Sequence, residues 1–548
     1  MARLQSGFQK AASCLLVSMA LIGGAAAQKQ RFLADDPIAR VPEIPVAYSL
    51  KVQQIDELYD FAYNSAHYKL PPPTPSLGIN TLGEVPDSSW YTNRDLRRMT
   101  REQLQRGPRT SAGPVPPFTV VAAKTEGVTP GFRILDGRGH LFFVKVDPAT
   151  NPEMATASDV MGALFFYALG YNVPENYILV AKPEDFGLSP QASITEPSGK
   201  NQPMRGKDLE KILNVVPRLP DGRIRVLASR AISGKIMGPF SYLGVRTDDP
   251  NDLIPHQQRR DLRGLAVFCA WLNHTDAKSL NSLDALQDTG LQARLVHYLV
   301  DFGAAFGSDS DIAKDPRHGR EFAVPTDGAQ LRQVFTLGLY FPDWQTVRYP
   351  SHLKAVGNFT AAAFDPGKWR PNYPNPAFLA MYPSDAYWAA KKVMAFTDDD
   401  IRAIVEQGQL SNAETVDYVA KTLSARRDAI GRAWFRRVLP VEGPRIEDNE
   451  LHFENLGVRY GFTSVPSYGY EWFRWDNQNG TKEAVPTSHS TTVPSELMLG
   501  AGHKDQYLGC TIKDEGQPDL STTVYFRADR GTWQLVGIDR TTNPPSLP

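Results

Sequence analysis

The alternation of apolar and polar residues predicts β-strands in the first half of the chain. Glycines fall in the short segments between the first three apolar runs, as turns between neighbouring strands require. A longer apolar run over 152–169 predicts a helix, which Gly170 would end because glycine readily adopts the left-handed conformation found after helix C-termini. The strands are expected at 118–123, 131–135, 141–146, 177–180 and 224–229.

Beyond Gly238 the spacing of apolar residues becomes helical. A hairpin is then expected over 282–300, with its turn at 287–290. An irregular segment rich in proline and aromatic residues follows over 304–383. Four apolar residues before the hairpin recur at intervals of three and four and predict one buried stripe along a helix: Leu262, Leu265, Cys269 and Leu272.

Helices return after the irregular segment, with Thr397 and Ser411 as the expected N-caps. Residues 446–548 contain short apolar runs with frequent turns and predict a small all-β module. The residues before 113 predict an extended arm with one short helix that starts near Val52. The last of the long helices has a core-facing stripe of five residues: Val416, Val419, Leu423, Ile430 and Trp434.

The composition limits the class of protein. The chain has 548 residues, of which 42% are hydrophobic and 22% charged, and its formal net charge is −1. At roughly 100–200 residues per domain, this length predicts two to four domains. The near-neutral charge gives no support for a nucleic-acid partner held by a basic surface.

The N-terminus has the features of a signal peptide. Arg3 and Lys10 are basic, residues 11–22 are apolar, and small residues end at Ala27, after which we expect cleavage. An uncleaved anchor is the alternative, but the apolar run is shorter than the ~20 residues that a membrane span needs. No transmembrane span is then expected in the mature chain. The expected location is the periplasm or the outside of a bacterial cell. The two cysteines that remain predict no disulfide framework.

Three segments that can carry chemistry follow one another in order. A lysine, Lys145, stands near the end of an apolar strand, Asp276 precedes Asn281 by five residues, and Asp301 begins an Asp-Phe-Gly sequence after another apolar strand. Phosphoryl transfer needs a lysine on the nucleotide phosphates, an aspartate that receives the acceptor hydroxyl's proton, and oxygen ligands for metal ions. Taken singly, each residue could belong to a turn or a strand edge. The ordered set predicts that Lys145 and Asp276 are catalytic and that Asn281 and Asp301 bind metal.

These segments resemble the protein-kinase-like superfamily, in its atypical branch near the HipA-type and phosphoinositide kinases. The resemblance covers about residues 118–305 and includes a helix with an early acidic residue, Asp159, that ends in a Leu-Gly-x-x-Val-Pro sequence. It implies that Asp159 pairs with Lys145, with Glu153 as the alternative partner. It also implies that ATP or a related nucleotide binds together with Mg²⁺ or Mn²⁺, and that a hinge for the base lies within 180–231.

The sequence departs from the common kinase pattern at three places. No Gly-x-Gly-x-x-Gly-x-Val loop is present, and the segment around Gly127 is a loose substitute that we expect to cover the nucleotide phosphates. No Ala-Pro-Glu follows Asp301, so an activation segment of the protein-kinase type is not supported. Thr275 stands where a typical kinase has arginine, which weakens the case for regulation by phosphorylation of such a segment.

The expected fold class is α+β: a two-lobed kinase-like core, with an antiparallel sheet in the N-lobe and a helical C-lobe, followed by a small all-β C-terminal domain. The expected parts are a signal peptide over 1–27, an N-terminal arm over 28–112, the N-lobe over 113–235, the C-lobe with its irregular insertion over 236–444, and the β-rich domain over 445–548.

The expected function is that of an exported, ATP-dependent phosphotransferase acting on an acceptor that the sequence does not identify: a protein, a lipid headgroup or a sugar. One alternative is a catalytically inactive kinase fold that binds or scaffolds in the cell envelope, with the C-terminal domain as the point of contact. The other is an adenylyl transferase on the same fold. Motifs for zinc, P-loop and dinucleotide sites do not occur in the sequence.

Overall fold

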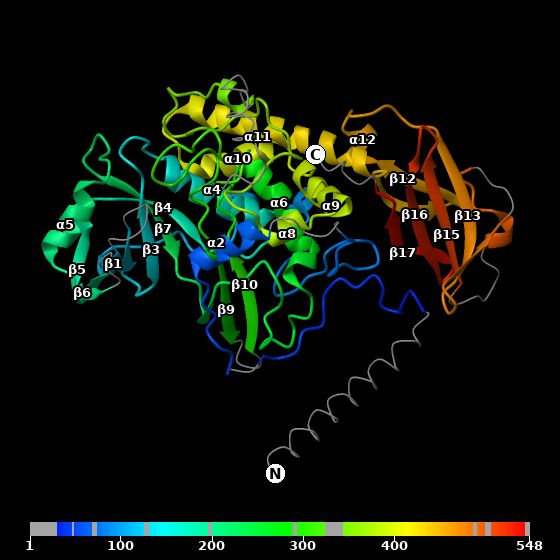
Figure 1. The fold of residues 1–548 in the computed structure, drawn as a ribbon, viewed down its shortest axis with the longest axis horizontal. Coiled ribbons are helices and arrows are strands. Elements are labelled where there is room, and N and C mark those ends of the chain that lie inside the picture. Colours follow the sequence, from blue (N-terminus) through cyan, green and yellow to red (C-terminus); the bar gives the residue numbers. More distant parts are fainter. Residues whose placement is uncertain are drawn as a thin grey trace, which may run out of the picture. The chain divides into compact units, whose positions relative to one another are not determined.

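The structure, a computed structural model, describes residues 30–46, 49–67, 74–124, 131–195, 200–288, 293–323, 343–485, 490–498 and 506–542. The expected signal peptide and Gly127 lie outside these residues. The described residues form two compact units of mixed α and β structure (Figure 1). The larger unit comprises Ala39–Ile79 and Val85–Arg437, and the smaller comprises the described parts of Met1–Ile38, Asn80–Glu84 and Val438–Asn543.

A seven-stranded sheet forms one part of the larger unit. Its strand order is β4-β7-β3-β2-β1-β5-β6, and all neighbours are antiparallel except β1 and β5. The five strands predicted from the sequence are confirmed to within one residue at each end. The strands are β1 (Phe118–Lys124), β2 (Gly131–Leu135), β3 (Leu141–Val146), β4 (Asn176–Ala181), β5 (Phe186–Thr195), β6 (Asn201–Pro203) and β7 (Ile224–Arg230).

Two of these strands and one helix were not predicted from the sequence pattern. In β5 only Phe186 and Ala192 are buried, so its apolar alternation is too weak to predict a strand. The unpredicted helix, α5 (Gly206–Asn214), is amphipathic and buries three apolar side chains in the core of the sheet. These are Leu209, Ile212 and Leu213.

Helix α4 (Met154–Ala168) follows β3 and is buried along nearly its whole length. A glycine in its middle, Gly162, allows Phe302 to approach, since a Cβ at this position would lie 2.5 Å from the Cβ of Phe302. The helix ends as predicted before Gly170, whose φ of +114° suits glycine and few other residues. The backbone at its start is also unusual, because Glu153 has a φ of +70°.

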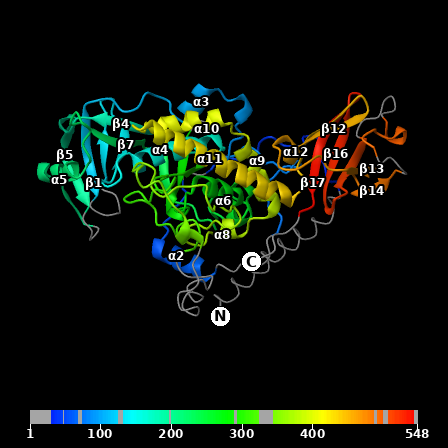
Figure 2. The same ribbon diagram turned by 90° about the horizontal axis from the view of Figure 1, so that it is seen from above.

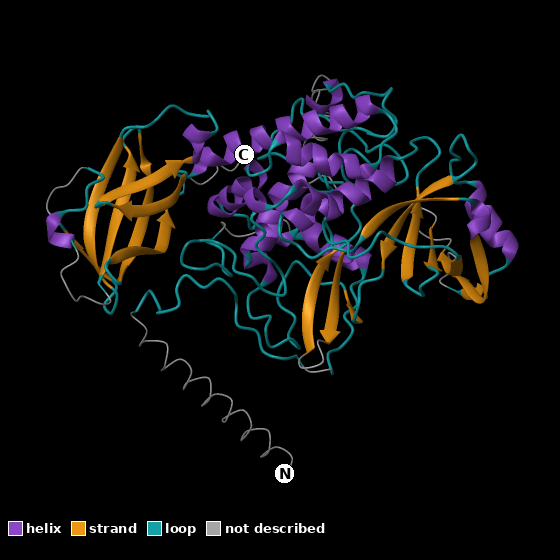
Figure 3. Ribbon diagram, turned by 180° about the vertical axis from the view of Figure 1, so that it is seen from behind, coloured by secondary structure: helices purple, strands orange, loops and turns teal. Residues whose placement is uncertain are grey.

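The predicted stripe of helix α6 (Arg260–Leu272) is buried, and the other residues of the helix are buried as well. Neighbouring helices surround α6, and they satisfy its buried charges: Arg263 donates to Asp385 of helix α9 at 3.3 Å. Figures 2 and 3 show these helices gathered in one region of the larger unit. The helices are α8 (Pro376–Leu379), α9 (Pro383–Met394), α10 (Asp398–Val405) and α11 (Ala413–Trp434).

The predicted N-caps of α10 and α11 have different outcomes. Thr397 caps α10 as predicted, with its hydroxyl accepting from the amide of Asp400 at 3.1 Å. The expected cap at Ser411 is wrong, because the side chain of Asn412 accepts from the amide of Glu414 at 2.8 Å and begins α11 one residue later. The predicted stripe of α11 is buried except at Val416, which is half-buried.

The predicted hairpin is present and leads directly to Asp301. Strand β9 (Ser282–Asp288) pairs with β10 (Ala293–Leu299), and β8 (Lys235–Gly238) adds a third strand to this sheet. Part of the expected turn lies outside the described residues. Because β10 ends at Leu299, the pairing of the hairpin determines where Asp301 emerges.

The smaller unit contains most of the C-terminal strands. Its five-stranded sheet has the order β14-β13-β15-β16-β17 and is antiparallel throughout, and β11 pairs with β12. Phe32 from the N-terminal arm packs in its core against Tyr507 and Tyr525. The elements are β11 (Val441–Glu447), β12 (Glu450–Asn455), α12 (Leu456–Arg459), β13 (Tyr468–Asp476), β14 (Thr481–Ala484), β15 (Tyr507–Asp514), β16 (Gln517–Asp529) and β17 (Thr532–Arg540).

Two further expectations concern membranes and cysteines. Among the described residues, no helix combines the length and the apolar character that crossing a bilayer requires. Cys269 lies in the larger unit and Cys510 in the smaller one, and both are buried free thiols.

Candidate active site

Lys145 occupies the face of β3 opposite to the core of the sheet. Its neighbours Val144 and Val146 are buried, whereas a third of the Lys145 side chain is exposed. Strand alternation therefore directs its ammonium group away from the core and towards helix α4 and the residues after β10.

Asp159 of α4 holds this ammonium group. Its Oδ2 lies 3.2 Å from the Nζ of Lys145, and its Oδ1 accepts a hydrogen bond of 2.8 Å from the amide of Phe302. The alternative partner, Glu153, instead accepts from the amide of Ser411 at 2.9 Å. One buried carboxylate thus joins the strand lysine to the Asp-Phe-Gly sequence.

Asp301 completes a cluster of three charged groups. Its Oδ1 lies 2.6 Å from the Nζ of Lys145, although 156 residues separate the two. Its backbone has a φ of +61°, a left-handed conformation that aspartate tolerates better than most residues. Phe302 then turns inward and stacks on Phe166 of α4 with ring centroids 5.1 Å apart, while 43% of the Asp301 side chain stays exposed.

Burial and charge oppose each other in this cluster. Burial raises the pKa of Asp159 to about 6, although Lys145 acts to lower it. Burial also acts to raise the pKa of Asp301, but the nearby ammonium of Lys145 outweighs it and the pKa is lowered. The pKa of Lys145 is raised, because its two carboxylates outweigh the effect of burial. At neutral pH the cluster therefore carries an excess negative charge, which a divalent cation can offset.

Asp276 and Asn281 lie in the loop that follows α6. The amide nitrogen of the Asn281 side chain donates to Asp276 twice, at 2.7 Å to the carbonyl and at 2.9 Å to Oδ2. The carbonyl of Asn281 accepts from the amide of Val300 at 3.0 Å. Since Val300 precedes Asp301, this bond holds the loop beside the end of the hairpin.

Two residues of this region were missed by sequence reasoning. Lys278 lies between two carboxylates, 3.4 Å from Asp276 and 2.6 Å from Glu57. Glu57 begins helix α2 (Glu57–Ala66) of the N-terminal arm, which packs on the short helix Ser279–Asn281. Lys278 could have been noted from its place two residues after Asp276, whereas no local signal identifies Glu57.

A third missed residue, Lys314, fastens the segment after Asp301 to the same loop. Its side chain is 1% exposed and donates to Thr275 at 2.6 Å and to Asp309 at 2.8 Å. Asp309 also pairs with His318 at 2.8 Å. A buried lysine thus already engages the hydroxyl of Thr275.

The oxygen atoms of Asp301 and Asn281 suit a hard divalent cation. Because Asn281 uses its amide nitrogen for Asp276, its Oδ1 has no hydrogen bond to any described residue. Two protein oxygens are enough for Mg²⁺ when phosphates complete its coordination. In the part of the chain that the structure describes, no group of three or more His, Cys, Asp or Glu side chains is placed to hold a metal ion. The residues present therefore fit a metal–nucleotide complex.

Comparison with known proteins gives only weak likenesses. No family model and no curated protein matches the chain. The Helicobacter pylori proinflammatory kinase CtkA is similar over 60% of this chain and 94% of its own, with 10% identity and a TM-score of 0.28. The Golgi casein kinase is similar over 72% of this chain and 95% of its own, with 8% identity and a TM-score of 0.28. A structure of the Golgi casein kinase with Mn/ADP bound is similar over 72% of this chain and 94% of its own, with 9% identity and a TM-score of 0.29. Likenesses of this strength carry no argument about fold or activity.

Proposed function

We propose that this chain is an exported phosphotransferase of the atypical kinase type that uses a nucleotide and a divalent metal ion. One observation carries the proposal: Lys145, Asp159 and Asp301 meet, although they come from a strand, a helix and the end of a hairpin. Gathering three charges in a partly buried place costs desolvation free energy, and such costs are concentrated at functional sites.

Each residue has a role in this proposal. Lys145 binds the α- and β-phosphates of the nucleotide, and Asp159 positions Lys145 by its ion pair. Asp301 and Asn281 hold the metal ion, which offsets the negative charge of the phosphates when it is bound. Asp276 orients the acceptor hydroxyl and receives its proton as the oxygen bonds to phosphorus and the bond to the nucleoside diphosphate breaks.

The proposal assigns the parts of the chain as follows. The seven-stranded sheet with α4 corresponds to an N-lobe, and the region of α6 to α11 corresponds to a helical C-lobe. The strands of the smaller unit form an all-β C-terminal domain for contact with the cell envelope. Residues 1–27 direct export to the periplasm or the cell exterior.

Calorimetry on the mature chain, residues 28–548, tests the metal role. We expect ADP to bind in the presence of Mn²⁺ and to lose most of its affinity when EDTA removes the metal. Asp301→Ala should abolish this metal dependence, whereas Asp519→Ala, at an exposed aspartate of the smaller unit, should retain it. Metal-dependent binding that is unchanged in Asp301→Ala would refute the role of Asp301.

Labelled ATP tests the reaction itself. The mature chain is incubated with a cell-envelope extract and Mn²⁺, once with ATP labelled on the γ-phosphate and once with ATP labelled on the α-phosphate. Product labelled only from the γ-phosphate supports the proposal. Product labelled from the α-phosphate would identify an adenylyl transferase instead, and absence of both products together with intact ADP binding would favour the scaffold.

A further inference from the structure

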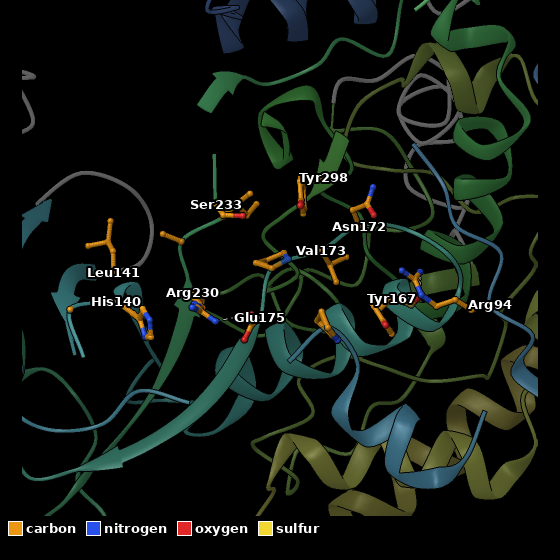
Figure 4. A pocket seen from close by; sticks show the side chains of 15 residues that line it. Arg94, His140, Leu141, Tyr167, Asn172, Val173, Glu175, Arg230, Ser233 and Tyr298 are labelled. Carbon is orange, nitrogen blue, oxygen red and sulfur yellow. Dashed lines mark hydrogen bonds and ion pairs between the residues drawn. The ribbon is translucent and has the colours of Figure 1, made fainter. Parts of the chain in front are cut away.

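A cavity of about 570 Å³ lies beside the first residues of β3 (Figure 4). Leu141 at the start of β3, Arg230 at the end of β7 and residues 231–233 line one part of it. Tyr298 of β10 and residues 172–175 after α4 line another part. A volume of this size lies in the range that small-molecule sites occupy.

Arg94 offers unused hydrogen-bond donors to this cavity. Its guanidinium lies 3.8 Å from the ring centroid of Tyr167, and its Nη1 donates to the carbonyl oxygens of Tyr167 at 2.7 Å and Tyr171 at 3.4 Å. Its remaining N–H groups have no acceptor, and no carboxylate forms an ion pair with it, among the described residues. Asp87 acts on Arg94 only from a longer distance.

The carboxylate that lines the cavity, Glu175, already has an ion-pair partner and a hydrogen-bond donor. Glu175 pairs with Arg230 at 3.0 Å and also accepts from the hydroxyl of Thr110 at 2.8 Å. His140 adds a third basic side chain, with Asp136 of the same turn 3.8 Å away. Figure 4 shows Arg94 and Arg230 approaching the cavity from different sides, with Glu175 beside Arg230. The lining thus has more basic groups than the carboxylate can neutralise.

The rest of the wall is suited to an apolar group. Proline, aliphatic and aromatic side chains separate the charged residues and would pack against a ring or a short hydrocarbon. The apolar lining residues are Pro108, Leu141, Val173, Pro174, Ala231 and Ile232, and the aromatic ones are Tyr167 and Tyr298.

We infer that this cavity binds a small organic anion, whose phosphate or carboxylate group is held by Arg94 and whose apolar part packs against the proline and aliphatic wall. Charge-assisted hydrogen bonds to a guanidinium give such a ligand its orientation. The inference concerns binding alone and does not depend on the transferase proposal.

Calorimetry with three probes tests the inference on the mature chain: phenyl phosphate, benzoate and the neutral benzyl alcohol. We expect at least one anion to bind with a stoichiometry of one and to bind about ten-fold or more tightly than benzyl alcohol. Binding of phenyl phosphate alone identifies an organic phosphate as the ligand class, and binding of benzoate alone identifies a carboxylate.

Three variants locate the site. Arg94→Gln should weaken binding of the anion about ten-fold or more, and Ser233→Trp, at an exposed position of the lining, should fill the cavity and abolish binding. Arg223→Gln lies outside the cavity and should leave the affinity unchanged. Absence of binding by both anions, or wild-type affinity in either Arg94→Gln or Ser233→Trp, would overturn the inference. Ser233→Trp decides the question if Arg94→Gln does not fold.

Discussion

Asp159 and Phe302 are 143 residues apart, and a hydrogen bond of 2.8 Å joins the carboxylate of the first to the backbone amide of the second. The same carboxylate pairs with Lys145. A change at Asp159 therefore acts on the lysine and on the Asp-Phe-Gly sequence together, because a single side chain serves both contacts.

The first prediction concerns pH. Since burial raises the pKa of Asp159 to about 6, this group takes up a proton between pH 7 and pH 5 and no longer balances the charge of Lys145. If Mn²⁺-ADP binds only when Asp159 is ionised, the affinity for Mn²⁺-ADP should fall about ten-fold as the pH falls from 7 to 5. Calorimetry on the wild type and on Asp159→Asn checks this, and the variant should bind weakly with little dependence on pH. An identical pH profile in both proteins would contradict it.

The raised pKa of Asp159 also predicts that its contribution to the free energy of unfolding is larger at low pH, where the affinity for Mn²⁺-ADP is expected to be lower. The folded protein binds a proton at Asp159 below about pH 6, whereas the unfolded chain does so only near the ordinary value of 3.8. Between these values the folded state holds more protons, so the contribution of Asp159 to the free energy of unfolding decreases as pH rises through 6. Urea unfolding at pH 4.5 and pH 7 in wild type and Asp159→Asn isolates this contribution as the difference between the two proteins.

Gly162→Ala should destabilise the protein by about 1–3 kcal/mol, although alanine normally favours a helix. The added Cβ would lie 2.5 Å from the Cβ of Phe302, so α4 or the Asp-Phe-Gly sequence has to shift. Gly206→Ala in α5 is the matched control, because a Cβ there meets no atom within 4 Å. Urea unfolding measures both variants, and equal stability for the two would show that α4 accommodates the methyl group.

Lys314→Met should lower the free energy of unfolding by about 3 kcal/mol, because it leaves Asp309 and Thr275 without their buried partner. Lys368→Met provides the control: this lysine is exposed and 3.7 Å from Asp365, so its loss should change stability by less than about 0.5 kcal/mol. Chemical denaturation distinguishes the two. A small effect at Lys314 would mean that the segment after Asp301 is held by other contacts.

Glu57→Gln should loosen α2 while changing the free energy of unfolding by less than about 1 kcal/mol, because 54% of the Glu57 side chain is exposed. Hydrogen–deuterium exchange should become faster over 57–66 and unchanged in α5. Glu210→Gln, at an exposed glutamate of α5, should leave exchange over 57–66 at the wild-type rate. Unaltered exchange in Glu57→Gln would show that the ion pair with Lys278 does not hold the helix.

Local patterns were sufficient for elements whose signal is contained in their own residues. The strand that carries Lys145, the helix that carries Asp159 and the hairpin before Asp301 follow from periodicity and turn residues, and the spacing of Asp276 and Asn281 identified their loop. The same patterns failed at β5, where apolar residues are sparse, and at the cap of α11, where the neighbouring residues Ser411 and Asn412 can both serve. Helix α5 was missed although Leu209, Ile212 and Leu213 have helical spacing, because the helix is only nine residues long.

The amino-acid sequence by itself thus determined the elements and the kinds of side chain that they carry. Tertiary structure alone decided which of them meet: Asp159 rather than Glu153 at Lys145, Glu57 at Lys278, Lys314 at Thr275, and Phe32 in the core of the C-terminal strands. The physical reason is the range of the interactions. Backbone preference and periodicity act over a few residues, whereas the pairing of charges and rings depends on how distant segments pack, and no short stretch of sequence records it.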